Sequence, residues 1–171
     1  MADRQMRDRI LDAAEARARR GGYNAFSFRE IAQDVGVSSA AIHYHFAAKA
    51  DLAAALTLRY TKRALERLGD PAGLTGAAAI DRVHALFRDA LTEDDQMCLC
   101  GLFAAERDIL PAGVDAAVAG FFQAILAYLR AAMRDGHAPD APEAVLAKLE
   151  GALILARTMR DVSIFHKATA R

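Results

Sequence analysis

Residues 37–52, VSSAAIHYHFAAKADL, hold the densest group of side chains that could do chemistry. Two histidines, His43 and His45, lie two positions apart and raise the possibility of a metal site. Side chains at this spacing on a helix point about 200° away from each other, so the two imidazoles cannot readily share one metal ion. The pattern therefore predicts no metal site, and the other reading is a helix that approaches a second surface.

Two short helices joined by a tight turn would position these side chains. Ser27 and Glu30 have the spacing of a capping box, which predicts a helix from Ser27 to about Asp34. Gly36 ends that helix, and Ser38 caps the next one, which ends near Phe46. A helix, a tight turn and a second helix form a helix-turn-helix by spacing.

The second helix of this pair is about two turns long and could not persist alone in water. Its role must therefore depend on the side chains that it exposes. Small residues at its start would let it enter a DNA major groove. Tyrosine and histidine can donate hydrogen bonds to phosphates or base edges, and Lys49 begins the next helix, where it would clamp a phosphate. The candidate DNA-contacting residues are Ser27, Arg29, Ser38, Ser39, Ala40, His43, Tyr44, His45 and Lys49. Two of them have an alternative: Arg29 could be a solvated arginine, and His45 could bond a neighbouring backbone group.

The segment RILDAAEARARRGGYNAFSFREIAQDVGVSSAAIHYHFAAKADL resembles the DNA-binding domain of TetR-type (TetR/AcrR) transcriptional regulators. The likeness extends over about residues 6–60. It includes Gly22-Tyr23, residues 28–32, Val35-Gly36-Val37, residues 44–46 and the stretch from Lys49 to Leu52. His43 stands where this family often has tyrosine, and Ala40 where glycine is common. Both positions can face DNA, so the operator sequence does not carry over from relatives.

The composition fits a globular regulator. The 171 residues are 54% hydrophobic, which is enough to bury a core, and no stretch of about 18 uninterrupted apolar residues predicts a membrane span. The N-terminus lacks the apolar run of a signal peptide, and two cysteines cannot form a disulfide framework, so we expect a cytoplasmic protein. The net charge is zero, but residues 1–66 carry 11 Lys and Arg against 8 Asp and Glu. A positive N-terminal part suits contact with nucleic acid.

Helical spacing along the whole chain predicts an all-α fold. We expect a first helix around residues 6–18, the helix-turn-helix pair, and a fourth helix over residues 49–68. A linker at 69–76 is followed by helices over residues 77–91, 97–110, 114–129 and 143–166. The predicted domains are residues 1–48, a three-helix DNA-binding domain with the helix-turn-helix, and residues 69–171, a helical effector-binding and dimerisation domain. Helix 49–68 links them.

The resemblance implies that the C-terminal helices form a small-molecule pocket and a dimer interface. Aromatic, apolar and polar side chains at helical spacing are the candidates for the pocket, although core packing is the alternative for each aromatic residue. They are His84, Phe87, Arg88, Leu91, Met97, Cys98, Phe103, Arg107 and Phe122. An arginine facing the cavity, Arg88 or Arg107, would favour an anionic effector. Val145, Leu149, Ala152 and Ala156 form an apolar stripe through which the last two helices could build a homodimer.

The predicted function is a homodimeric transcriptional regulator, a repressor that a small-molecule effector releases from double-stranded operator DNA. We expect it to use no cofactor or metal and to bind no membrane. One alternative is a thiol-based redox-responsive regulator using Cys98 and Cys100, although the two residues suit packing at the pocket wall. A cysteine-dependent enzyme with His84 or His137 as base lacks any nucleophile signature. A DNA-binding module without an effector leaves about a hundred further residues unexplained.

Overall fold

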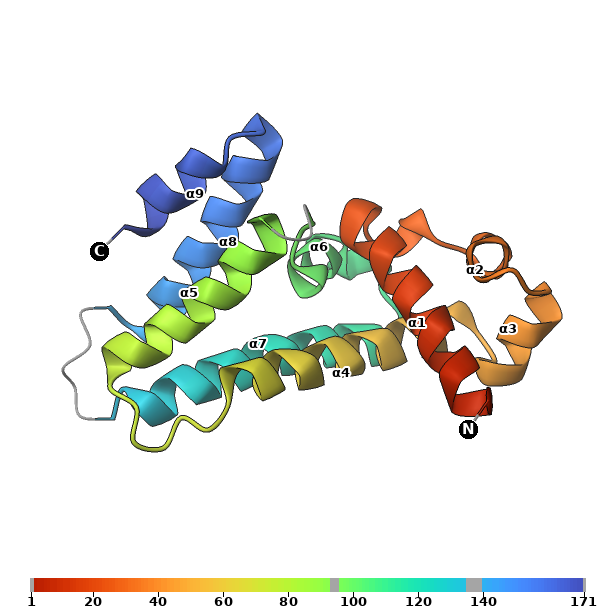
Figure 1. The fold of residues 1–171 in the computed structure, drawn as a ribbon, viewed down its shortest axis with the longest axis horizontal. Coiled ribbons are helices and arrows are strands. Elements are labelled where there is room, and N and C mark those ends of the chain that lie inside the picture. The colour runs from red at the N-terminus through yellow and green to blue at the C-terminus, as the bar shows by residue number, and fades with distance from the viewer. Residues whose placement is uncertain (1, 93–95, 135–139, 171) are drawn as a thin grey trace. The chain divides into compact units, whose positions relative to one another are not determined.

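A computed structural model describes residues 2–92, 96–134 and 140–170, in which every regular element is helical. This confirms the all-α class. The elements are α1 (Ala2–Gly21), the short 3-10 helix η1 (Tyr23–Ala25), α2 (Phe28–Val35), α3 (Ser39–His45), α4 (Lys49–Leu68), α5 (Gly76–Thr92), α6 (Leu99–Ala105), the 3-10 helix η2 (Arg107–Ile109), α7 (Ala112–Ala132), α8 (Pro142–Met159) and α9 (Val162–Thr169) (Figure 1).

The helices belong to two compact units. The first contains residues 1–60 and 99–119, and the second contains residues 61–98 and 120–171. In the first unit, α1 packs against α2, η1 and α6. In the second, α8 packs against α9 and α5, as Figure 1 also shows. Residues 99–119 therefore group with the N-terminal helices, whereas the sequence placed them in the C-terminal domain.

The apolar stripe of α1 forms the centre of the first unit. Ile10, Leu11, Ala14 and Ala18 are fully buried, as their helical spacing predicted. One ion-pair cluster attaches α4 to α1. The Arg59 guanidinium lies 2.8 Å from a carboxylate oxygen of Asp12 and 3.2 Å from one of Glu15. These contacts fix the helix that carries Lys49 against the first helix.

Two predicted helices are shorter than the sequence suggested. The helix expected over residues 97–110 is α6, which begins at Leu99 and stops at Ala105, after which η2 forms. The helix expected over residues 143–166 is interrupted at Arg160, whose φ of 52° is left-handed and closes the end of α8. Asp161 then caps α9 by accepting a hydrogen bond from the Ser163 amide. A capping aspartate after Arg160 was the local signal for this break.

The second unit is built around α5, α8 and α9, which pack against one another. Its buried residues are mostly aliphatic, with Phe87, Phe121 and Phe165 as the large aromatic members. Among the described helices, α7 is the one that is long and apolar enough to cross a membrane by length and composition alone. Val118, Ile125 and Leu129 on this helix are buried within the protein, as in the core helix of a globular domain.

Candidate nucleic-acid interface

The turn between α2 and α3 has the geometry that the sequence predicted. The Ser27 hydroxyl accepts a hydrogen bond from the Glu30 amide at 3.3 Å and donates one to the Glu30 carboxylate at 2.8 Å. Gly36 adopts the left-handed conformation, with φ 75°, and the Val37 amide donates back to the Ala32 carbonyl at 2.9 Å. This Schellman arrangement satisfies the end of α2 and directs the chain into α3. Ser27 is therefore occupied by its capping role.

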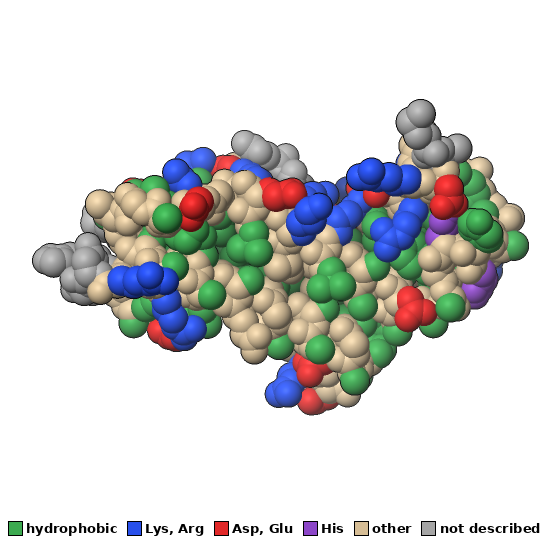
Figure 2. Space-filling model, turned by 90° about the horizontal axis from the view of Figure 1, so that it is seen from below, with side chains coloured by type: hydrophobic (Ala, Val, Ile, Leu, Met, Phe, Trp, Pro, Cys, Tyr) green, Lys and Arg blue, Asp and Glu red, His purple; other side chains and the backbone are tan. Residues whose placement is uncertain are grey.

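Helix α3 buries one face and exposes another. The Ser38 hydroxyl caps α3 by accepting a hydrogen bond from the Ala41 amide. On the buried face of the helix, Ile42 is fully shielded from solvent. The exposed positions are Ser39, Ala40, His43 and Tyr44. Tyr44 is largely open to solvent, with 79% exposure. Histidine side chains are visible on this part of the surface (Figure 2).

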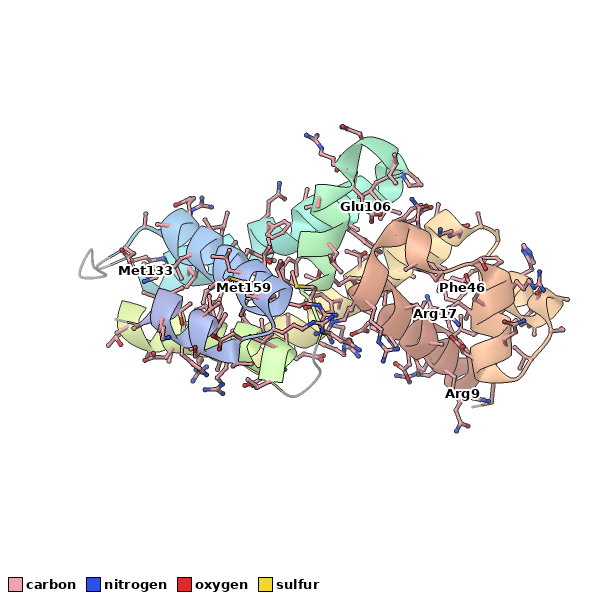
Figure 3. The ribbon with its side chains drawn as sticks, turned by 90° about the horizontal axis from the view of Figure 1, so that it is seen from above. Arg9, Arg17, Phe46, Glu106, Met133 and Met159 are labelled. Carbon is pink, nitrogen blue, oxygen red and sulfur yellow. The ribbon has the colours of Figure 1, made fainter. Side chains whose placement is uncertain are left out.

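A second set of contacts, which the sequence did not predict, holds α2 against α1. Arg17 on α1 binds Asp34 at 2.5 Å and Glu30 at 3.2 Å, and Arg9 donates to the Val35 carbonyl at 2.6 Å (Figure 3). The Arg17 guanidinium lowers the pKa of the Asp34 carboxyl by hydrogen bonding. These partners are 13 to 26 residues apart, so no local spacing could have indicated them.

Arg29 is the cation that remains available near the start of α2. It is exposed and makes no ion pair with the described residues. The His43 ring packs edge-on against Phe28, with ring centroids 4.7 Å apart, and this contact orients the imidazole on the outer face of α3. Arg29, Ser39, Ala40, His43 and Tyr44 thus form one exposed set, which we call the α2–α3 face.

Lys49 is not presented as the open clamp that its position suggested. Its ammonium nitrogen lies 4.3 Å from the centre of the Tyr23 ring and 4.9 Å from that of Phe26. Burial lowers the pKa of Lys49, while the carboxylates of Glu106 and Glu30 act in the opposite direction. In this structure the residue packs η1 against the start of α4 through cation–π contacts.

His45 is also held by the fold. Its side chain is only 8% exposed, and Nδ1 lies 3.6 Å from a carboxylate oxygen of Asp3 on α1. The Tyr44 ring stands edge-on to it, with ring centroids 5.1 Å apart. These contacts favour the structural alternative for His45 over a phosphate contact.

Glu106, at the junction between α6 and η2, joins these elements to the N-terminal helices (Figure 3). Its carboxylate accepts a hydrogen bond from the Tyr23 amide at 2.5 Å. The preceding Gly22 has φ 80°, and a Cβ there would lie 2.3 Å from the same carboxylate oxygen. Glycine at this position therefore admits both the backbone conformation and the close approach of Glu106.

The predicted pocket residues divide between the two compact units. Phe87, Leu91, Met97 and Cys98 are buried in the second unit. His84 Nε2 lies 2.8 Å from the Thr169 hydroxyl, which itself donates to the Phe165 carbonyl at 2.7 Å. The histidine is therefore the donor in its contact with Thr169. Burial, followed by the charge of Arg88, lowers the pKa of His84.

Three other predicted pocket residues have different surroundings. Phe103 is buried in the first unit, where its ring meets Tyr23 edge-on. Phe122 is half-buried and packs edge-on against Phe121. The Arg107 side chain is 75% exposed and pairs with Asp115 on the surface of the first unit.

The remaining arginine, Arg88, forms an ion pair. It binds Asp89, which also accepts from Arg67 at 2.5 Å. Desolvation raises the pKa of Asp89, but the two arginines outweigh it, so the net shift is downward. The anionic-effector argument, which required an arginine facing a cavity, therefore has no support in these contacts.

The two cysteines lie in the interior. Cys98 and Cys100 are both buried, and Cys98 precedes α6 while Cys100 lies in its first turn. Burial suits packing rather than thiol reactivity. His137 and the acidic residues 93–95 lie outside the described residues. Among the described residues, no group of three or more metal-ligating side chains gathers that could hold an ion.

Comparison with known proteins connects this geometry to a family. The family model described as bacterial regulatory proteins, tetR family, matches residues 10–56. A TetR transcriptional regulator from Legionella pneumophila has 30% identity and a TM-score of 0.81, covering 94% of this chain and 91% of its own. A TetR-family regulator from Agrobacterium tumefaciens has 26% identity and a TM-score of 0.78, covering 98% and 95%. One from Chloroflexus aurantiacus has 21% identity and a TM-score of 0.83, covering 98% and 92%. Comparison with the curated proteins gives no significant match.

Proposed function

Because the chain belongs to the tetR family of bacterial regulatory proteins, a family of DNA-binding transcriptional regulators and not of enzymes, we propose that it is a homodimeric repressor released from its operator by a small-molecule effector. DNA binding and transcriptional regulation follow from the family. The sign of regulation, the effector and the dimer interface are the parts proposed here.

The α2–α3 face is the observation that carries the DNA-binding part of the proposal. It combines a slim, capped helix with an exposed tyrosine and imidazole, and Arg29 lies beside it. Side chains of these types contact phosphates and base edges when a recognition helix lies in the major groove. Their exposure leaves them available for such contacts.

Selection of DNA by the purified protein tests this assignment. Random duplexes retained by the protein should converge on a sequence with two-fold related half-sites, with centres separated by a multiple of about 34 Å. A matched selection with Ser39→Ala or His43→Ala should change the preferred bases without abolishing retention. Convergence on one asymmetric half-site bound by a monomer would contradict the homodimeric repressor.

The dimer surface that we propose differs from the stripe expected from the sequence. Val145, Leu149, Ala152 and Ala156 are buried within the protomer, where α8 packs against α5 and α9. The outer face of α8 instead carries small and apolar residues at helical spacing: Ala144, Ala147, Gly151, Ile154, Leu155 and Thr158. We call this the outer α8 face.

The outer α8 face has the properties of a helix-packing surface. Ile154 and Leu155 are 50% and 51% exposed, and a Cβ added to Gly151 would meet nothing within 4 Å. Small residues permit close helix crossing, and large exposed aliphatic residues gain free energy when a second copy covers them. A symmetric dimer would place this same face on both protomers.

Effector release requires energetic coupling between two sites, and that coupling is reciprocal. If an effector lowers operator affinity by a given factor, operator DNA must lower effector affinity by the same factor. Titration of a binding ligand into the protein alone and into the protein–operator complex measures both quantities. An effector whose affinity is the same in the two titrations would exclude this release mechanism.

A further inference from the structure

A cavity of about 120 Å³ lies in the second compact unit, between the last turn of α4 and one face of α5. Two of the residues that line it are arginines and three are apolar: Arg67, Leu68, Arg82, Ala85 and Leu86. Its volume is that of roughly four water molecules, whereas the cavity beside His84 measures only about 20 Å³. The larger cavity can therefore admit a small organic molecule.

The residues of α5 at this cavity share one face of the helix. Arg82, Ala85, Leu86 and Asp89 follow one another at steps of one to three positions and span seven, so they form a single stripe. The two charged residues stand at the ends of the stripe, and the two apolar residues lie between them. Alanine at position 85 leaves space that a longer side chain would fill, so the cavity has an apolar middle and charged ends.

Arg82 is positioned by the end of α4 and keeps its full charge there. Its Nη1 donates to the Leu68 carbonyl at 2.6 Å, and the Tyr128 hydroxyl donates to the same oxygen at 3.1 Å. A Cβ at the following residue, Gly69, would lie 3.2 Å from Arg82 Nη1, so glycine there leaves room for the guanidinium. A carbonyl is neutral, and among the described residues no carboxylate forms an ion pair with Arg82.

Arg67, at the other end of the cavity, shares its carboxylate partner. Its Nη2 lies 2.5 Å from one oxygen of Asp89, and Arg88 lies 2.7 Å from the other oxygen. One carboxylate therefore faces two guanidinium groups, and Arg82 adds another positive charge to the same face of α5. A guanidinium carries five N–H donors, and Arg67 and Arg82 each use one nitrogen in these contacts. Donors and excess positive charge remain for an anion in the cavity.

We propose that this cavity is the effector site, and that the effector is a small aliphatic carboxylate. The inference rests on the proposed function as an effector-responsive regulator. The planar fork of a guanidinium matches the two oxygens of a carboxylate, and Arg67 and Arg82 supply two such forks. The apolar residues between them receive the hydrocarbon part of the ligand, and the volume limits that part to a few carbon atoms. Neither arginine is among the candidates that the sequence suggested.

A carboxylate and its neutral isostere test the charge of the site. In titrations of the full chain at constant ionic strength, isobutyrate should bind about tenfold more tightly than isobutyramide, because only the carboxylate accepts charge-assisted hydrogen bonds with both oxygens. Chemical shifts of the arginine Nε–H groups and of the α5 backbone amides measure both affinities, even when binding is weak. Equal affinity for the two compounds, or no shift at Arg67, Arg82 and α5, would overturn the proposal.

Two substitutions separate the charge of the site from its shape. Arg82→Gln keeps a donor for the Leu68 carbonyl and removes the charge, so the affinity for isobutyrate should fall about tenfold. Ala85→Leu fills the cavity and keeps both guanidinium groups, so it should abolish binding, whereas a general attraction to surface charge would survive it. Arg134→Gln, at an exposed arginine of the same unit that does not line the cavity, is the matched control and should bind as wild type does. An unchanged affinity in Ala85→Leu would overturn the proposal.

Operator affinity, measured in the same solutions, distinguishes this inference from the proposed function. If isobutyrate binds through Arg82 but leaves operator affinity unchanged, the carboxylate site stands and the release mechanism fails. If isobutyrate releases operator DNA equally well from Ala85→Leu, the release mechanism stands and this cavity is not the effector site.

Discussion

Individual side chains on the α2–α3 face differ in how a contact with phosphate would affect the salt dependence of DNA binding. Arg29 carries a full charge, whereas Tyr44 offers one neutral hydroxyl on an exposed ring. A cation that neutralises a phosphate releases counterions, and a hydroxyl does not. The two kinds of contact therefore give different salt dependences even where they lower affinity to a similar extent.

Arg29→Ala should lower affinity for operator and random DNA alike, and should reduce the slope of log affinity against log salt by about 1. Tyr44→Phe should weaken binding about fivefold with the slope unchanged, since one hydrogen bond is worth about 1 kcal/mol. Fluorescence anisotropy over a salt series measures both effects. Arg134→Ala, at an exposed arginine in the second unit, is the control and should change neither. An unchanged slope in Arg29→Ala would show that Arg29 is a solvated arginine.

One substitution at Lys49 separates the contribution of its charge from the contribution of its packing. Lys49→Met keeps a long stem against Tyr23 and Phe26 and removes the ammonium group. Because the cation–π contacts are lost, the free energy of unfolding should fall by about 1 kcal/mol. The salt dependence of DNA binding should stay the same. A slope reduced as much as in Arg29→Ala would restore the phosphate clamp that the sequence suggested.

The shielded carboxylate of Glu150 gives stability a defined dependence on pH. Its folded pKa of about 7 lies above the ordinary value of 4.5, so the folded state binds the additional proton between these two values. Stability from this group is therefore present below pH 4.5 and is lost as the pH rises towards 7. Urea unfolding should show wild type losing up to about 3 kcal/mol relative to Glu150→Gln between pH 4.5 and 8. A constant difference between the two proteins across this range would contradict the raised pKa.

At the scale of elements, the sequence predicted the features that neighbouring residues determine, and it did not predict those that depend on residues of another segment. Helices α2 and α3 were placed to within one or two residues because Ser27, Gly36 and Ser38 act on their own neighbours. The break at Arg160 was missed because an arginine rarely adopts the left-handed conformation. In the candidate site, exposure of His43 and Tyr44 followed from helical spacing. The covering of Lys49 did not, because it depends on Tyr23 and Phe26 in a different segment.

The contact between Glu106 and the Gly22–Tyr23 turn can be tested by paired substitutions. Gly22→Ala should destabilise the protein by more than Gly36→Ala, because both glycines have positive φ but only the first would bring a Cβ against a side chain. Gly36→Ala, the matched control, should cost about 1 kcal/mol from its backbone conformation alone. Thermal or urea unfolding of the four proteins in the Gly22 and Glu106 cycle measures the coupling.

In that cycle, Glu106→Ala should remove part of the penalty of Gly22→Ala, so the double variant should be more stable than the sum of the single effects predicts. Glu106→Ala alone should lower stability through loss of the Tyr23 amide contact. Strictly additive effects would show that Glu106 does not press against the turn, and would remove this link between α6 and the N-terminal helices.

At the scale of the whole molecule, the outer α8 face determines whether two recognition helices act together. Ile154→Asp should convert the dimer into a monomer, because it places a charge among exposed aliphatic residues that a second copy would cover. Leu58→Asp, at a leucine of α4 that is 61% exposed, is the matched control and should remain dimeric. Analytical ultracentrifugation gives the oligomeric state of both variants.

DNA binding adds a second readout to the same pair of variants. A monomer carries one α2–α3 face and cannot engage two half-sites at once, so Ile154→Asp should bind a full operator no more tightly than an isolated half-site. Leu58→Asp should keep the advantage of the full operator over the half-site. If Ile154→Asp remains dimeric and keeps this advantage, the interface lies elsewhere, and the exposed residues of α8 must serve another contact.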